Sequence, residues 1–571
     1  MVHLVKKNYF ACMNYTKLFL PVVLSFLFAC QPEKNNKIGS DISTDAAQIK
    51  QGKELFNTLC SSCHDFKNKG IGPNLSGVTR EVGSQWIKEF IKNPAKKIDE
   101  KDPRAKALFE QFRVYMQGFP SLKGQELNSL LSYMHTFEKP QEESVDSIPS
   151  LKNPIPDTIQ SSGIVIDLEY VTQIPASQNE SPTARINKID CEKGSGRLFV
   201  HDLRGFLYEL KDGKPSLYMS MKESKKDFIH KPGLGTGLGS FAFHPEFMSN
   251  GLLYTTHTEP AGTKPTDFNY ADSIPVALQW VVVEWKLKDP SSDTFSATSR
   301  ELMRIDFVTG IHGVQEITFN PNSTKGDADY GMLYLGVGDG ASAEKGFIHL
   351  AHHKGGEVWS SILRIDPRGN NSDNGKYGIP TDNPFANTPD KVKEIWAYGF
   401  RNPNRMTWDE SGRLLATDIG MHNIEELNVI EPGKFYGWPI REGTFLLNPY
   451  GDINKVYPLP DNDADESVTY PLIQYDHDEG AAISGGFTTN ESPLNGKYIF
   501  GDIPTGKFFV SDLSVTNPEI QKLDVSFNNQ VTDWHTLSGS RRVDLRFGKG
   551  CNGEVYIYTK ADGKIYRIKE K

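Results

Sequence analysis

The pattern of hydrophobic positions changes once along this chain, from a helical period to an alternating one. Between Ala46 and Leu59 the apolar residues follow an amphipathic helix, with Gly52 and Phe56 at its packing positions. A second helical pattern runs from Gln125 to Phe137. Together these segments predict a small all-α domain over residues 46–139.

Farther along, short apolar strands recur in pairs that are separated by turns containing Gly or Asp. Six such pairs, rich in β-branched and aromatic residues, predict an all-β six-bladed propeller over residues 166–571. A β-sandwich or a large barrel is the alternative, and it fits six related units less well. The pairs are 198–200 with 206–208, 252–254 with 281–283, 332–334 with 362–365, 414–416 with 426–430, 498–500 with 508–510, and 555–557 with 565–568.

The segment between the two predicted domains is polar and contains several prolines. Residues 140–165 therefore read as a linker. A chain of 571 residues is long enough for more than one domain.

The N-terminus has the pattern of an export signal. Lys17 precedes an apolar run, 18–29, that is too short to span a bilayer comfortably. Residues 27–30 resemble a lipoprotein cleavage box, with Cys30 receiving the lipid; an ordinary cleaved signal with an incidental cysteine is the alternative. We therefore expect a signal peptide over residues 1–29, a tether over 30–45, and a periplasmic, outer-membrane or cell-surface lipoprotein that meets the membrane only through its lipid.

Composition narrows the class of partner. Charged residues make up 24% and aromatic residues 11% of the chain, as in ordinary globular proteins. The net charge of −9 gives no reason to expect a nucleic-acid partner.

The first candidate site is the sequence Cys60-Ser-Ser-Cys63-His64. Two thiols three positions apart, followed by histidine, form the attachment pattern of c-type haem. The thiols bond to the haem vinyl groups, and His64 then lies under the iron as an axial ligand. Zinc sites and chance also produce this pattern, so the flanking residues matter.

The flanks are similar to those of class I cytochromes c over residues 46–139. Residues 71–75 resemble the loop that covers the haem, and residues 115–120 resemble the loop that carries the methionine ligand. The resemblance implies that Met116 is the second axial ligand, with Met134 as the alternative. A methionine ligand raises the haem potential relative to two histidines.

Cys191 and Cys551 lie near the two ends of the predicted propeller. A disulfide between them is plausible in an oxidising compartment. Two buried thiols are the alternative, because the sequence does not show the distance between them.

From about residue 166 to 569, the chain is similar to the glucose/sorbosone dehydrogenase family of soluble quinoprotein sugar dehydrogenases. This resemblance implies a six-bladed propeller, pyrroloquinoline quinone (PQQ), Ca²⁺, and oxidation of an aldose sugar at its anomeric carbon to the lactone. The landmarks are 241–247, 312–313, 336–340, 398–403, 418–421, 425–428 and 436–439.

The resemblance also implies roles for individual residues. His312 matches the catalytic base, and an imidazole suits that role because its pKa lies near working pH. Asp339 matches the carboxylate that orients this histidine. Arg401 and Asn402 match residues that contact the quinone, where a guanidinium stabilises developing negative charge.

Two calcium positions are implied in the same way. The backbone carbonyls of Gly420 and Met421 map to the ion that polarises the quinone. Glu426 and the carbonyl of Tyr436 map to a second, structural ion. Ca²⁺ takes oxygen donors of this kind.

The chain departs from the family pattern where cationic or amide side chains hold the quinone carboxylates. Those positions fall on Gly235, Asn490 and Thr505. A tricarboxylate without cationic partners binds weakly. Substitutes in the last blade are Arg541, Arg542 or Arg546.

The sequence thus predicts an exported quinohaem dehydrogenase. A sugar or related alcohol would be oxidised in the propeller, and haem c would pass the electrons to an external acceptor such as a respiratory cytochrome. The alternatives are a non-catalytic propeller that binds a ligand beside a cytochrome, and an enzyme that acts on a non-sugar alcohol.

Overall fold

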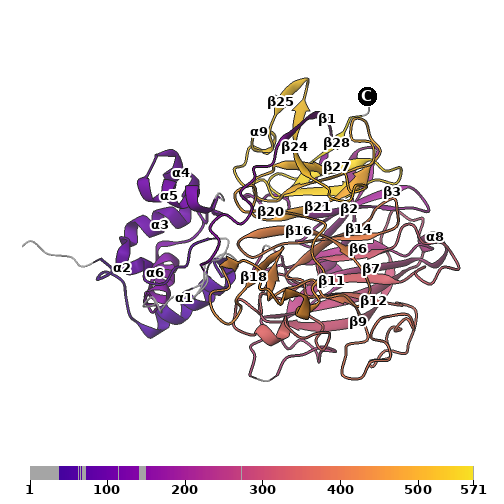
Figure 1. Ribbon diagram of the computed structural model, residues 1–571, viewed down its shortest axis with the longest axis horizontal. Coiled ribbons are helices and arrows are strands. Elements are labelled where there is room, and N and C mark those ends of the chain that lie inside the picture. The colour runs from indigo at the N-terminus through magenta and orange to yellow at the C-terminus, as the bar shows by residue number, and fades with distance from the viewer. Residues whose placement is uncertain are drawn as a thin grey trace, which may run out of the picture.

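The computed structural model describes residues 38–61, 64, 66, 72–112, 115–139, 149–233, 235–271 and 273–569. A helical domain comes first in the chain and lies beside a larger β-domain (Figure 1). Cys30 and Cys63 lie outside the described residues, as do the predicted signal peptide and the first part of the predicted linker, residues 140–148. Within the described ranges, no helix combines the length and the apolar character needed to cross a bilayer.

Six helices form the first domain in its described part. The first, α1, has the predicted bounds and begins where the Asp45 carboxylate accepts a hydrogen bond from the backbone N–H of Gln48, at 2.9 Å. Gly52 lets α1 approach α6 closely, because a Cβ there would lie 1.9 Å from the carbonyl oxygen of Ser129. The helices are α1 (Ala46–Leu59), α2 (Val78–Glu81), α3 (Ser84–Lys92), α4 (Pro94–Asp99), α5 (Pro103–Phe112) and α6 (Gly124–Met134).

The last helix ends three residues before the predicted Phe137. The hydroxyl of Thr136 donates to the carbonyl of Tyr133 at 2.8 Å, and the backbone N–H of Thr136 donates to the same carbonyl at 3.1 Å. Such tighter bonds compete with the regular helical ladder and end it.

Six groups of four strands form the blades of the described β-domain and confirm the predicted propeller; four groups are separate sheets, and the last two belong to one nine-stranded sheet. Each predicted strand pair lies in two neighbouring strands of one blade. The innermost strands touch one another in a closed ring: β2, β6, β10, β14, β21 and β26.

The blades, each given from its innermost strand outward, have the following bounds. They are β2 (Ile186–Glu192), β3 (Arg197–Asp202), β4 (Phe206–Lys211) and β5 (Lys214–Ser220); β6 (Leu238–Phe243), β7 (Leu252–Pro260), β8 (Leu278–Leu287) and β9 (Ala297–Phe307); β10 (Glu316–Phe319), β11 (Leu333–Val337), β12 (Ser361–Ile365) and β13 (Ile395–Tyr398); β14 (Pro403–Trp408), β15 (Leu414–Asp418), β16 (Ile424–Ile430) and β20 (Ile473–Asp476); β21 (Ile483–Thr489), β22 (Lys497–Asp502), β23 (Phe508–Ser511) and β24 (Ile520–Phe527); and β26 (Leu545–Lys549), β27 (Val555–Thr559), β28 (Lys564–Ile568) and β1 (Ser161–Gln173).

Shorter elements lie between and beside the blades. A small sheet joins three strands from the loops of the fourth blade, and β25 forms a hairpin with β24. These elements are α7 (Met221–Ser224), α8 (Phe247–Asn250), η1 (Ile348–Leu350), β17 (Arg441–Glu442), β18 (Phe445–Leu447), β19 (Val456–Tyr457), η2 (Asp463–Glu466), β25 (Gln530–Thr532) and α9 (Trp534–Ser538).

The two ends of the propeller sequence meet in the last blade. Strand β1 pairs antiparallel with β28 and parallel with β24, so it links the fifth blade to the sixth. A disulfide joins Cys191 in β2 to Cys551, which follows β26, with a Cα–Cα distance of 5.3 Å. Of the two alternatives left open by the sequence, the structure has the disulfide, and it fastens the first blade to the last.

The segment that joins the domains runs along the propeller before it enters β1. The backbone N–H of Leu151 donates to the carbonyl of Val456 at 2.8 Å, and that of Ile155 donates to the Asp476 carboxylate at 3.0 Å. Strand β1 begins at Ser161, ahead of the predicted propeller start at residue 166. The described part of this segment therefore has fixed contacts on the propeller.

Candidate functional site

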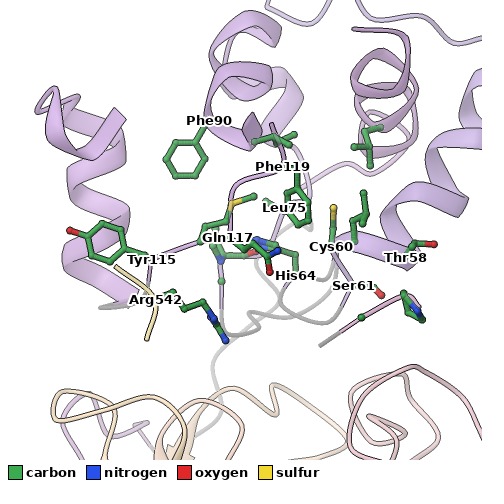
Figure 2. A pocket seen from close by; sticks show the side chains of 18 of the residues that line it. Thr58, Cys60, Ser61, His64, Leu75, Phe90, Tyr115, Gln117, Phe119 and Arg542 are labelled. Carbon is green, nitrogen blue, oxygen red and sulfur yellow. The ribbon is translucent and has the colours of Figure 1, made fainter. Parts of the chain in front are cut away.

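A cavity of about 480 Å³ lies between the helical domain and one end of the propeller. Cys60, His64 and Met116 line its helical side. Residues 309–311, which lead toward β10, line its propeller side. Figure 2 shows Cys60 and His64 close together in this cavity, with Arg542 approaching from the propeller.

The imidazole of His64 is held so that one of its ring nitrogens would be free to bind the iron of a haem. Its Nδ1 atom lies 2.9 Å from the carbonyl oxygen of Pro73, which leaves Nε2 as the atom able to bind iron. Gly72 is necessary for this packing, because a Cβ there would lie 2.3 Å from the ring. Burial lowers the pKa of His64 and favours the neutral form that binds metals. The residues present therefore fit a haem group.

Both candidate methionine ligands line the same cavity. Met116 lies in the non-helical segment between α5 and α6, and it is partly buried. Met134 ends α6, is 4% exposed, and packs among core residues such as Leu130. This contrast supports Met116 as the second ligand, which stays a prediction, as does the attachment of haem through Cys60 and Cys63.

On the propeller, the structure brings His312 and Asp339 together. His312 precedes β10 and Asp339 follows β11, and these adjacent strands form one hairpin. The His312 Nδ1 atom lies 2.8 Å from Oδ1 of Asp339. His312 has a φ of 51°, and a Cβ at Gly338 would lie 2.4 Å from the His312 carbonyl oxygen, so this contact depends on an unusual local backbone.

Other groups hold the Asp339 carboxylate in place. The indole N–H of Trp438 donates to Oδ2 at 3.1 Å, and the backbone N–H of Ala341 donates to Oδ1 at 2.7 Å. Asp339 is fully buried. Both carboxylate oxygens of Asp339 are therefore held in place, and Asp339 can in turn orient the imidazole of His312.

Arg401 lies next to this pair, because the backbone N–H of Asp339 donates to the Arg401 carbonyl at 2.9 Å. The backbone N–H groups of Arg401 and Asn402 donate to the two oxygens of Asp418, at 2.9 and 2.6 Å. The Arg401 side chain is buried and forms an ion pair with Glu344. Three of the predicted site residues, His312, Asp339 and Arg401, thus lie in one place.

Glu344 is a member of this group that the sequence did not indicate. Burial opposes its charge, but Arg401 and then His312 and Lys345 outweigh burial and lower its pKa to about 2. Burial also opposes the charge of Arg401, but the attraction of nearby carboxylates, chiefly that of Glu344, outweighs burial and raises the pKa of Arg401. The site therefore contains a fully charged Arg–Glu pair beside the His–Asp pair. No motif marks Glu344, since it follows Asp339 in an irregular loop.

Of the two carbonyls mapped to the first calcium, that of Gly420 does not fit the ion. The carbonyl of Gly420 accepts a hydrogen bond from Arg401 at 2.7 Å, so a calcium ion there would be pressed against a guanidinium. The neighbouring backbone N–H of Met421 donates to Glu442 at 2.8 Å. Among the described residues, no group of three His, Cys, Asp or Glu side chains could hold a metal.

Of the two groups mapped to the second calcium, the Glu426 carboxylate is engaged elsewhere. Glu426 accepts the backbone N–H of Gly443 at 2.9 Å, and burial raises its pKa to about 7. The Tyr436 hydroxyl donates to the carbonyl of Val429 at 2.7 Å, and this contact does not involve the Tyr436 carbonyl that was mapped to the ion. Calcium binding through these residues stays a prediction.

The three positions that depart from the family pattern hold no cation for a quinone. Gly235 faces Gln315, whose amide donates to the Gly235 carbonyl at 2.9 Å. Asn490 is exposed and pairs with Glu410. Thr505 donates to Asp502 at 2.6 Å.

Of the three proposed substitutes, Arg541 points away from the propeller and pairs with Asp99 of the helical domain. Arg542 lines the cavity and donates to Asp544 at 3.0 Å. Arg546 is buried in β26.

Comparison with known proteins gives two matches along the chain. Residues 194–567 match the family described as glucose/sorbosone dehydrogenase, and residues 49–138 match cytochrome c. The HIPL2 protein of Arabidopsis thaliana is 28% identical over 372 residues, covering 56% of this chain and 50% of its own length. Quinoprotein glucose dehydrogenase B of Acinetobacter calcoaceticus is 24% identical over 356 residues, covering 58% of this chain and 64% of its own.

A PQQ-bound aldose sugar dehydrogenase from Streptomyces coelicolor aligns in structure with a TM-score of 0.46 at 18% identity, covering 70% of this chain and 97% of that one.

This chain spans about half the length of the plant relatives that it matches. The match over residues 194–567 covers most of the chain. The protein therefore belongs to the glucose/sorbosone dehydrogenase family, an oxidoreductase family, and carries a cytochrome c domain ahead of the propeller.

Proposed function

We propose that this protein oxidises an aldose sugar or a related alcohol with PQQ in the propeller and passes the electrons through haem c to an external acceptor such as a respiratory cytochrome. One observation carries the proposal. The cavity lined by His64 and Met116 reaches residues 309–311, which immediately precede His312. The candidate catalytic base and the candidate haem site thus lie at the same end of the propeller.

His312 is suited to take a proton from the substrate hydroxyl. Its Nδ1 atom donates to Asp339, so the lone pair of the neutral ring lies on Nε2. When Nε2 takes the proton, the buried carboxylate of Asp339 stabilises the resulting imidazolium. The base and its orienting group are therefore present before substrate binds.

Arg401 supplies the positive charge next to this base. It is buried, so its attraction for a developing anion is weakly screened. Glu344 holds its guanidinium in position. PQQ, when bound, would supply the two-electron acceptor, and haem c would supply the one-electron carrier. The contacts of Gly420 do not fit calcium, so the proposal includes no step through that ion.

Export and lipid anchoring through Cys30 are part of the same proposal. Their support is the N-terminal sequence pattern together with the cytochrome c domain, since c-type attachment occurs outside the cytoplasm. The disulfide between Cys191 and Cys551 is in keeping with an oxidising compartment.

The second candidate is a propeller that binds a ligand without catalysis. The lack of a cation at Gly235, Asn490 and Thr505 favours it. A human relative that is 25% identical over 391 residues is named Hedgehog-interacting protein, a name that describes binding. The His–Asp pair and its neighbour Arg401 favour the enzyme.

The deciding experiment uses the haem-loaded protein. PQQ is added with and without Ca²⁺, a panel of sugars and alcohols is titrated, and haem reduction is followed by absorption. We expect substrate-dependent reduction that is lost in His312→Ala. A protein that binds PQQ but reduces no haem with any substrate, or that binds no PQQ at all, would favour the binding module.

A further inference from the structure

The Arg401 guanidinium lies against the loop to which the sequence mapped the first calcium ion. Its Nη1 atom donates to the carbonyl of Gly420 at 2.7 Å and to that of Ile419 at 3.2 Å. Its Nε atom donates to Oε1 of Glu344 at 3.1 Å, and Nη2 donates to the same oxygen. Each nitrogen of this side chain is therefore bonded to an oxygen, as a bound cation would be.

The loop that carries these carbonyls is fixed from its other side. The four consecutive backbone N–H groups of residues 421–424 all donate to Oε1 of Glu442, over distances of 2.8 to 3.0 Å. A Cβ at Gly420 would lie 1.8 Å from the carbonyl oxygen of Ile424, so this tight turn requires glycine. The chain's own groups thus hold the loop, with its N–H donors on Glu442 and two of its carbonyls on Arg401.

A calcium ion on the Gly420 carbonyl would lie too close to the guanidinium. Ca²⁺ binds oxygen at about 2.3–2.6 Å, so the ion would be within about 5 Å of Arg401 Nη1. The guanidinium keeps its charge at any working pH. Because the Arg401 side chain is only 5% exposed, the repulsion would be weakly screened. The adjacent carboxylate, that of Glu344, is already paired with Arg401.

The same guanidinium lies beside the candidate base. It is 5.8 Å from the centre of the Trp438 ring, and the Trp438 indole N–H donates to Oδ2 of Asp339 at 3.1 Å. Asp339 in turn contacts His312. A buried positive charge at this position can stabilise an anion that forms next to His312, which is the effect otherwise expected of a metal ion.

We propose that Arg401 takes the place of the first calcium ion, so that this loop of the propeller binds no Ca²⁺. Glu344 makes the replacement possible, because its carboxylate compensates the buried guanidinium. The part of the inference that concerns calcium is independent of any quinone. The part in which Arg401 supplies the positive charge next to the quinone rests on the proposed function.

The first test locates calcium in the wild-type, haem-loaded protein. Crystals are soaked in excess Ca²⁺, and the anomalous scattering of the ion is mapped. We expect no ion bound to the carbonyl of Gly420. An ion at that carbonyl would overturn the inference, whether or not a second ion is found at Glu426.

The second test counts calcium ions by calorimetry after treatment with a chelator. Arg401→Met leaves the Glu344 carboxylate and the two carbonyls without a cation, so it should bind one more Ca²⁺ than the wild type. Arg401→Lys keeps a positive charge and should bind no more than the wild type. Equal calcium binding by Arg401→Met and the wild type would overturn the inference; if Arg401→Met does not fold, the crystals of the wild type decide.

Arg413→Met is the matched control. The Arg413 guanidinium also bonds a carboxylate, that of Asp409 at 2.6 Å, and a backbone carbonyl, that of Leu513 at 2.9 Å. It precedes β15 at the end of the fourth blade opposite Arg401. This variant should bind no additional calcium, and an additional ion would show that the gain in Arg401→Met is not specific to the loop.

PQQ binding separates the inference from the proposed function. If PQQ binds, Arg401→Met should weaken its binding by about tenfold or more in chelator, because a buried charge-assisted contact is lost. Unchanged PQQ affinity would overturn the part that concerns the quinone. A wild-type protein that binds neither PQQ nor calcium at Gly420 would remove the quinone function and keep the replacement of calcium by Arg401. Sugar-dependent haem reduction together with an ion at Gly420 would keep the enzyme and overturn the inference.

Discussion

The imidazole of His312 and the carboxylate of Asp339 lie 2.8 Å apart, from Nδ1 to Oδ1, although they are 27 positions apart in the chain. The hairpin of β10 and β11 produces this contact, since one residue precedes the first strand and the other follows the second. Trp438, from the fourth blade, donates to the other oxygen of Asp339 at 3.1 Å. The geometry of the base is thus set by two blades of the propeller.

Asp339→Asn should strongly reduce catalysis while leaving the fold intact. The amide keeps the shape, but it no longer favours the proton on Nδ1 or stabilises the imidazolium. We expect substrate-dependent haem reduction to slow by about 10²- to 10⁴-fold, the usual contribution of a general base. The control is Asp327→Asn, which changes an exposed residue in the loop between β10 and β11. If Asp339→Asn reduced haem at the wild-type rate, His312 would not be the catalytic base.

Met116→His should lower the haem midpoint potential, because a thioether ligand raises it relative to a second imidazole. Both Met116 and Met134 line the cavity, so the matched control is Met134→Leu. That control is expected to destabilise the helical core with little effect on potential, since Met134 is buried in α6. A large fall in potential for Met134→Leu, with none for Met116→His, would exchange the roles of the two residues.

Replacing both Cys191 and Cys551 by serine should lower the free energy of unfolding. The disulfide closes a loop with a sequence separation of 360, and it joins the first blade to the last. Native disulfides typically contribute about 2–5 kcal/mol. Denaturant titration checks the change, and reducing agent should bring the wild-type protein to the level of the double variant. Equal stability of the oxidised wild type and the variant would show that the bond contributes nothing.

The sequence predicted the parts of this molecule that short-range patterns encode. The helix at Ala46–Leu59 has its own period and its own N-cap, and the six strand pairs repeat. These pairs are the middle strands of each blade, where alternation is regular. The innermost strands were not predicted, because they carry buried charged residues such as Arg405, which interrupt the apolar pattern.

Contacts between distant loops carry no such pattern. Glu344 pairs with Arg401 across 57 residues, and nothing in its neighbourhood marks it as a partner. Lys560 reaches the cavity only because β27 ends there. Arg541 was offered as a quinone ligand, yet its side chain pairs with Asp99 of the helical domain. Such roles depend on how blades and domains meet.

Acid should destabilise the protein partly through His244. Its Nδ1 accepts the backbone N–H of Glu246 at 3.0 Å, and burial, then Arg368, lowers its pKa to about 4. The unfolded chain takes up this proton near pH 6.5 and the folded chain does so only near pH 4, so stability falls as pH drops through that interval. We expect His244→Asn, which keeps an acceptor but cannot be protonated, to recover about 1–3 kcal/mol of that loss.

The measurement for His244 is urea unfolding at pH 7 and at pH 4.5. The difference between the two pH values should be smaller in the variant than in the wild type. His535→Asn is the control, because His535 is exposed. If the stability of His244→Asn and of the wild type depended on pH in the same way, His244 would not contribute to the loss of stability in acid.

Arg541→Ala should slow electron transfer between the domains without affecting either site alone. Arg541 pairs with Asp99 and lies over the ring of Tyr115 at 5.1 Å, and Tyr115 directly precedes Met116. Partly exposed contacts of this kind are worth about 1 kcal/mol or less, so the first-order rate of haem reduction should fall by only a few-fold. Stopped-flow mixing with substrate measures this rate. Lys286→Ala, which changes an exposed residue of strand β8, serves as the control.

In the wild type the rate should not depend on protein concentration, since the tether keeps donor and acceptor together. A rate that rises with concentration would place the transfer between molecules, and Arg541 would then have no part in it.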